Sequence, residues 1–160
     1  MRKVFVMPLF GAFIVALFVT AIAWGTATAP ASSRSASVVI STRTLPKLGT
    51  VLVNSKGLTL YMFVPDKQKR VTCFSTCAVI WPPVFLPAGA KTVASGKAES
   101  KLLGSDPDSA GGRVVTYNHW PLYLYVGDTK PGTATGQAIN LNGGLWYVLT
   151  PAGKVVKTKA

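Results

Sequence analysis

Two aspartates stand in the same short phrase and are the residues of this chain best suited to do chemistry. The phrase Tyr-x-aromatic-x-x-Asp runs from Tyr61 to Asp66 and again from Tyr123 to Asp128, a constant offset of 62 residues. Paired carboxylates can share a cation or divide general acid and base roles. A carboxylate just past a strand can instead accept hydrogen bonds from backbone N–H groups of the following turn. No third acid stands at ligand spacing, so we predict the structural role and assign no catalytic or metal-binding residue.

The two cysteines, Cys73 and Cys77, are separated by three residues. In an exported chain, which the N-terminal segment described below indicates, a local disulfide is the default expectation. The spacing is not the C-x-x-C of thiol oxidoreductases, and no second cysteine pair is present for a zinc site. A soft copper site that combines both cysteines with Met62 and His119 remains as an alternative, supported only by ligand softness.

His119 and the tryptophans are the remaining candidates for chemistry. His119 is the sole histidine and falls in a predicted turn, so we expect a solvated side chain. Trp81, Trp120 and Trp146 can form an aromatic platform for a glycan or a quinone-like ring, although packing in or around the core is the more frequent fate of such rings. No nucleotide-binding loop, zinc-protease motif or nucleophile elbow is present. We therefore predict no cofactor.

The elements that position these residues are predicted to be short strands in hairpins. A turn cluster at 54–57 separates apolar runs at 51–53 and 58–64, and a second one at 118–121 separates 113–117 from 122–126. Further strands are expected at 145–149 and 154–156, joined by a turn at 150–153. Fifteen Gly and eleven Pro leave room for single helical turns only, at 78–81 and 100–103. The predicted class is all-β, a small domain of two tandem antiparallel repeats.

Within each phrase the aromatic residues are two positions apart, so they share one face of a strand. Tyr61 with Phe63, and Tyr123 with Tyr125, are expected on one face, because side chains alternate along a strand. The opposite face of the first strand carries only apolar residues, namely Leu60, Met62 and Val64. Strands that are apolar on both faces are expected to be buried on both sides.

The N-terminal segment has the order of regions found in a secretory signal. Arg2 and Lys3 precede an apolar run at 4–24, and a stretch of small residues follows. The run is long enough to span a bilayer, so an uncleaved membrane anchor is the alternative to a cleaved leader over residues 1–31. No cysteine lies near the end of the run, which excludes a lipid-modified N-terminus. Residues 32–47 are rich in Ser and Ala and are predicted to be a flexible linker.

The charge balance constrains the partners. Seventeen Lys and Arg oppose five Asp and Glu, a formal net charge of +12. Such a surface favours polyanions, namely anionic envelope polymers or anionic lipids. Nucleic acid is not expected, because an exported domain would rarely meet it. A purely solubilising surface is the simpler reading.

The order of motifs over residues 48–153 resembles a known family. The two phrases are joined by Cys73-x-x-x-Cys77-Ala78-x-x-Trp81-Pro82-Pro83 and followed by Gly127-Asp128-Thr129-Lys130-Pro131-Gly132 and Trp146-Tyr147-Val148. This order resembles bacterial secreted-repeat proteins described as predicted lipoproteins with a Yx(F/W/Y)xxD motif. The resemblance implies export and a β unit of two repeats, and it carries no established biochemical function. This chain departs from it in lacking the lipobox cysteine and in having His119-Trp120 before the second Pro-Leu-Tyr.

The sequence therefore predicts a leader or anchor followed by a linker and one domain. The domain covers 48–160, with repeat one at about 48–87 and repeat two at about 110–153. The expected location is extracellular or on the outer face of the envelope, with membrane attachment only through an uncleaved N-terminal segment. The expected function is that of a non-enzymatic binding or structural module with a basic surface. A redox or metal-dependent module using the cysteines, the motif aspartates or His119 is the alternative.

Overall fold

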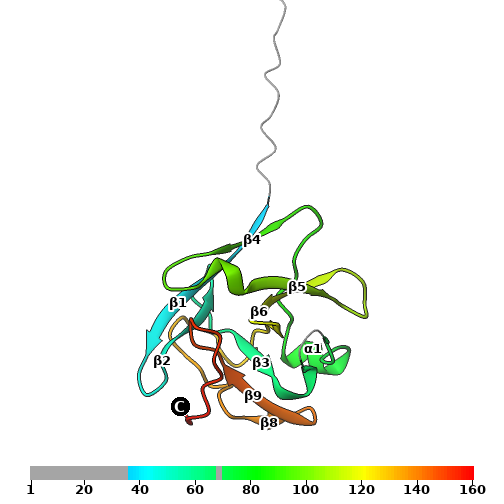
Figure 1. Ribbon diagram of the computed structural model, residues 1–160. Coiled ribbons are helices and arrows are strands. Elements are labelled where there is room, and N and C mark those ends of the chain that lie inside the picture. The colour runs from blue at the N-terminus through cyan, green and yellow to red at the C-terminus, as the bar shows by residue number, and fades with distance from the viewer. Residues whose placement is uncertain (1–35, 68–69) are drawn as a thin grey trace, which may run out of the picture. The chain divides into compact units, whose positions relative to one another are not determined.

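Residues 36–67 and 70–160 are described by the computed structural model, and they form short strands joined by turns (Figure 1). The strands are β1 (Ser37–Leu45), β2 (Gly49–Asn54), β3 (Tyr61–Phe63), β4 (Lys91–Ala94), β5 (Leu103–Pro107), β6 (Arg113–Tyr117), β7 (Trp120–Pro121), β8 (Asn140–Leu141) and β9 (Gly144–Val148). They associate in the orders β2-β1-β4, β3-β9-β8 and β5-β6-β7. One α-helix, α1 (Thr76–Ile80), and two 3-10 turns, η1 (Val64–Asp66) and η2 (Ser100–Leu102), complete the described elements. The predicted all-β class is confirmed, and none of the described helices is long and apolar enough to cross a membrane.

The linker prediction is wrong from residue 37 onward, because β1 occupies most of it. β1 pairs antiparallel with β2 and parallel with β4, and Ile40 at its centre is fully buried. The low-complexity Ser and Ala residues conceal the β-branched run at 38–40, which is typical of a strand. The predicted leader or anchor at 1–31 lies outside the described residues.

The first hairpin has the predicted turn but a shorter second strand. Asn54 Oδ1 accepts hydrogen bonds from the backbone N–H groups of Lys56 and Leu58, at 2.9 and 3.0 Å, and so fixes the turn. β3 ends at Phe63, since Pro65 enters the 3-10 turn η1 directly afterwards. Val64, which was predicted to be buried, is 42% exposed for this reason.

In the second half, β6 and β9 lie close to their predicted positions, whereas two predicted strands do not form. Residues 122–126 contribute only isolated bridges, from Tyr123 to Tyr61 and to Pro83. Residues 154–156 contribute one bridge, between Leu149 and Val155, across the predicted turn. The helical turns expected at 78–81 and 100–103 appear as α1 and η2.

Both faces of β3 are buried, as predicted. One face contributes Tyr61 and Phe63 to a cluster that we call the aromatic core, which also contains Trp81, Tyr123 and Trp146. The other face contributes Met62 to a cluster that we call the aliphatic core. Its buried members are Ile40, Leu52, Leu60, Met62, Val115, Tyr117, Leu122 and Leu149. The first motif therefore lies between two hydrophobic cores.

Candidate functional site

The two motif tyrosines face each other across the centre of the domain. The backbone N–H of Tyr61 donates to the carbonyl of Tyr123 at 2.9 Å, and the N–H of Tyr123 donates back to the carbonyl of Tyr61 at 2.9 Å. This reciprocal antiparallel bridge joins equivalent residues of the two repeats. The repeats are therefore related by an approximate two-fold axis between these residues.

The side chains cross this axis. The Tyr61 hydroxyl donates to Asp128 Oδ2 at 2.5 Å, and the Tyr123 hydroxyl donates to Asp66 Oδ2 at 2.6 Å. Each repeat thus supplies the donor for the carboxylate of the other repeat. We call these contacts the crossed pairs.

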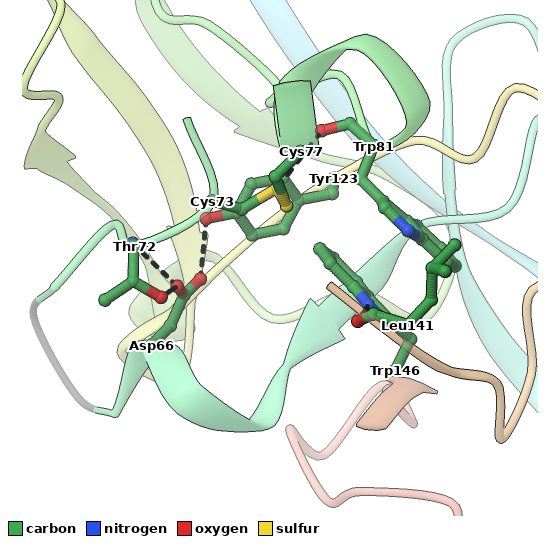
Figure 2. Close-up of a disulfide and its surroundings, with 8 residues drawn as sticks. All are labelled: Asp66, Thr72, Cys73, Cys77, Trp81, Tyr123, Leu141 and Trp146. Carbon is green, nitrogen blue, oxygen red and sulfur yellow. Dashed lines mark hydrogen bonds between the residues drawn. A yellow bond between two sulfur atoms is a disulfide. The ribbon is translucent and has the colours of Figure 1, made fainter. Parts of the chain in front are cut away.

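The second oxygen of each carboxylate fixes the turn of its own repeat. Asp66 Oδ1 accepts from the N–H and hydroxyl of Thr72, at 2.8 and 2.6 Å (Figure 2). Asp128 Oδ1 accepts from the N–H and hydroxyl of Thr135 at the same two distances. The predicted capping role of both aspartates is present in the structure. Each carboxylate also accepts a hydrogen bond from a tyrosine hydroxyl of the opposite repeat, a contact that the sequence does not predict.

Burial shapes the electrostatics of the crossed pairs. Asp66 is fully buried, and removal from water raises the pKa of its carboxyl, while hydrogen bonds from Thr72 and Tyr123 pull that pKa down. Burial also raises the pKa of Tyr61, and the hydrogen bond to Asp128 raises it further. Burial and the charge of Asp66 do the same to the pKa of Tyr123. Both tyrosines are therefore held as neutral hydroxyl donors.

Four aromatic rings stack beside the crossed pairs. Tyr125 stacks on Trp81 at 4.3 Å, Trp81 on Trp146 at 3.9 Å, and Trp146 on Phe63 at 4.1 Å between ring centroids. Tyr61 and Tyr123 meet the tryptophans edge-on. Trp81 and Trp146 have no exposed surface, which contradicts their use as a platform for a glycan or a quinone. Trp120 remains partly exposed on β7.

Cys73 and Cys77 form the predicted disulfide (Figure 2). Both sulfurs belong to the aromatic core, whereas Met62 lies in the aliphatic core on the other face of β3. The copper alternative is wrong, because the thiols are consumed and Met62 points to the opposite side. Among the described residues, no group of three or more His, Cys, Asp or Glu is arranged to hold a metal ion.

His119 lies in the turn between β6 and β7, as predicted, and its side chain is exposed. Its backbone has a positive φ of 66°, a conformation that non-glycine residues adopt mainly in turns. Asn118, not His119, anchors this turn to the rest of the domain: its side-chain amide donates a hydrogen bond to the carbonyl of Gly153 at 3.0 Å. No described side chain is bonded to His119 as a catalytic partner would be.

Two segments of the chain, residues 42–85 and 106–150, match a family described as a secreted repeat of unknown function. The chain belongs to this family. Each matched segment contains one copy of the motif, so the predicted duplication is confirmed, and the family description agrees with a place outside the cytoplasm. The first segment begins inside β1, earlier than the repeat boundary predicted at about residue 48. No match was found among curated proteins or among solved structures.

The exterior of this secreted-repeat domain is more basic than its composition alone indicates. Asp66 and Asp128 are buried, so Glu99, Asp106 and Asp108 are the acids left to offset the surface cations. In the described part of the chain, the only ion pair is between Lys101 and Glu99, at 2.8 Å. The exposed cations include Arg43, Lys56, Lys91, Lys97, Lys130, Lys154 and Lys157.

A polar cleft of about 600 Å³ lies on this basic exterior, over β1, β2 and the turn that follows β2. Arg43 and Lys56 are its cationic lining residues. Sequence reasoning missed the cleft because Ser95, which follows β4, reaches it only through the parallel pairing of β4 with β1. The alternation of Val39, Ser41 and Arg43 was the available signal, since it places a mixed polar and basic face on a strand.

Proposed function

We propose that this protein is a non-enzymatic binding module outside the cytoplasm that contacts an anionic polymer of the cell envelope through its basic exterior. The observation that carries the proposal is the burial of both motif aspartates in the crossed pairs. These carboxylates are used to hold the fold together, and they form no ion pair with the described surface cations.

The arrangement of the core supports a binding role over an enzymatic one. The motif residues are engaged with one another, and their carboxylates lie away from solvent. A general acid or base must come within hydrogen-bond reach of its substrate. The exposed Lys and Arg side chains, in contrast, are free to approach an external partner.

Membership of the secreted-repeat family supports the location. A protein outside the cytoplasm meets anionic envelope polymers at high local density, and a positively charged surface concentrates it on them. In this proposal the N-terminal segment is either removed on export or retained as the only membrane attachment. N-terminal sequencing of the exported protein distinguishes the two.

The test is cosedimentation of the exported protein with an isolated anionic wall polymer at increasing salt. We expect strong binding at about 0.05 M salt and loss of binding toward 1 M, because the screening length falls from about 10 Å at 0.1 M to about 3 Å at 1 M. Neutral dextran is the control and should not bind at any salt concentration. Binding that ignores salt, or equal binding to dextran, would contradict the proposal.

A further inference from the structure

Three alternating residues of β1, with Thr42 between two of them, line one side of the cleft. Val39, Ser41 and Arg43 occupy every second position of β1, so they share one face of the strand, and all three line the cleft. Val53 lines it from β2, opposite Ser41 in the antiparallel register. Val39 and Val53 thus add two aliphatic side chains to a lining that is otherwise mainly polar and cationic.

The two cations of the cleft are positioned by the backbone. Lys56 lies in the turn that Asn54 fixes through its hydrogen bonds to the N–H groups of Lys56 and Leu58. The Arg43 guanidinium lies against Gly57, where an added Cβ would come within 3.1 Å of Nη2. Gly57 has a positive φ of 77°, so both its conformation and its lack of a side chain suit this turn.

Neither cation is neutralised inside the described part of the molecule. Arg43 and Lys56 form no ion pair with a described acid, and both side chains are exposed. Two unpaired cations beside one cleft attract an anionic group, and an arginine in addition offers a planar fork of donors that matches phosphate oxygens.

Hydroxyl groups surround these cations and are available to a ligand. Ser41, Ser55 and Ser95 line the cleft, and their hydroxyls make no hydrogen bond with described residues. A serine hydroxyl can both donate and accept, which suits the alcohol groups of a polyol. The residues that line the cleft include no aromatic side chain, so it lacks the flat apolar wall on which a sugar ring could stack.

From this combination we infer that the cleft binds a phosphate-bearing polyol chain. Arg43 and Lys56 contact the phosphate, and the serine hydroxyls contact the alcohol groups of the chain. The aliphatic side chains of Val39 and Val53, which also line the cleft, contact its C–H groups. This inference rests on the proposed function, and it names the site and the chemical class of the anionic polymer.

The experiment compares two variants that lose the same charge in different places. Arg43→Gln with Lys56→Gln removes both cations of the cleft, whereas Lys154→Gln with Lys157→Gln removes two exposed cations that do not line it. Binding of soluble poly(glycerol phosphate) is measured by calorimetry on the full exported protein, and each variant's melting temperature is checked. We expect the cleft variant to bind about tenfold or more weakly and the control variant to lose only a few fold, since contacts to a charged group contribute about 1.5–3 kcal/mol.

A third variant tests the polyol part of the ligand. Ser41→Ala with Ser95→Ala removes two hydroxyls without changing the charge. It should weaken binding of poly(glycerol phosphate) about threefold or more and leave binding of inorganic polyphosphate, which has no alcohol groups, unchanged. Equal effects on both polymers would overturn the assignment of a polyol.

The remaining outcomes separate the two proposals. If the cleft and control variants weaken polymer binding equally, the cleft is not the binding site, and a general polyanion-binding surface remains. Failure of the unaltered protein to bind any anionic polymer would overturn the proposed function itself. If the protein binds phosphatidylglycerol vesicles but not soluble poly(glycerol phosphate), the ligand is a lipid surface and not the polymer.

Discussion

A carboxylate buried in a protein core requires donors to replace its water, and Asp66 and Asp128 each have three. For Asp66 these are the N–H and hydroxyl of Thr72 and the hydroxyl of Tyr123. The sequence predicted the turn donors, because a carboxylate after a strand is a common cap. The crossed pairs could not be predicted, since nothing in one repeat specifies which side chain of the other repeat approaches it.

A double-mutant cycle measures this cross-repeat contact. Tyr61→Phe should lower the free energy of unfolding by about 1–3 kcal/mol, because it leaves buried Asp128 short of a donor. Combined with Asp128→Asn, it should show a coupling energy of about 1 kcal/mol or more. Tyr61 does not contact Asp66, so the effects of Tyr61→Phe and Asp66→Asn on the free energy of unfolding should be nearly additive. Urea unfolding of the variants checks all of these values.

Tyr147→Phe provides the matched control for this cycle. Tyr147 is only partly buried, and its hydroxyl forms no hydrogen bond with a described residue, so its loss should change stability by less than about 0.5 kcal/mol. If Tyr61 couples to Asp66 as strongly as to Asp128, the crossed geometry is incorrect.

The same tyrosines should make the domain sensitive to alkali. The pKa values of Tyr61 and Tyr123 are raised above the ordinary 10.0, chiefly by burial. Their contribution to stability is complete below pH 10, and it is lost as pH rises further, because the unfolded chain releases protons that the folded chain retains. Each tyrosine should contribute a slope of about 1.4 kcal/mol per pH unit above that point.

Urea unfolding at several pH values above about 10 measures this slope. Tyr61→Phe should reduce this slope by the contribution of one tyrosine, about 1.4 kcal/mol per pH unit. Burial also raises the pKa of Tyr117, so Tyr117 should still contribute to the slope in that variant. A slope unchanged by the substitution would show that Tyr61 does not hold its proton in the folded state.

At the scale of elements, turns were easier to predict than strand lengths. The turn after β2 follows from Asn54 and Gly57, whose local preferences determine it. The early end of β3 follows from Pro65, which lacks a backbone N–H for the sheet and enters a 3-10 turn. β1 was missed because composition suggested a linker, while its pairing with both β2 and β4 depends on contacts remote in the sequence.

The disulfide should stabilise the domain modestly. Cys73 and Cys77 are four residues apart, and closing so short a loop contributes less than the roughly 3 kcal/mol expected for a 15-residue loop. Cys73→Ala with Cys77→Ala should therefore leave a folded domain with a lower melting temperature and unchanged polymer binding. Reduction of the unaltered protein should give a similar shift, and complete unfolding on reduction would contradict this expectation.

The aromatic stack depends on a glycine. A Cβ added at Gly136 would lie 2.8 Å from Trp81 Cη2 and 3.0 Å from Tyr61 Cζ, and both rings are fully buried. Gly136→Ala should therefore cost about 1–3 kcal/mol through overpacking. Its near-ultraviolet circular dichroism should change as the tryptophans shift. An unaltered spectrum and melting temperature would show that the core has space at this point.

At the scale of the whole molecule, duplication creates a core that neither repeat completes alone. Tyr61 needs the carboxylate of repeat two, Tyr123 needs that of repeat one, and β3 pairs with β9 near the end of the chain. The constant 62-residue offset revealed the duplication from sequence. The interlocking of the repeats and the cleft required the tertiary structure, because both depend on segments brought together from distant parts of the chain.

In this account the motif residues stabilise the fold and the basic exterior binds the polymer, and one variant tests this separation directly. Tyr61→Phe weakens a crossed pair without changing the charge or the cleft. We predict that thermal unfolding of this variant shifts to lower temperature, while its dissociation constant for poly(glycerol phosphate), measured well below the transition, equals that of the unaltered protein. An unchanged unfolding temperature together with weakened binding would contradict the claim, because it would place the motif in the binding site rather than in the fold.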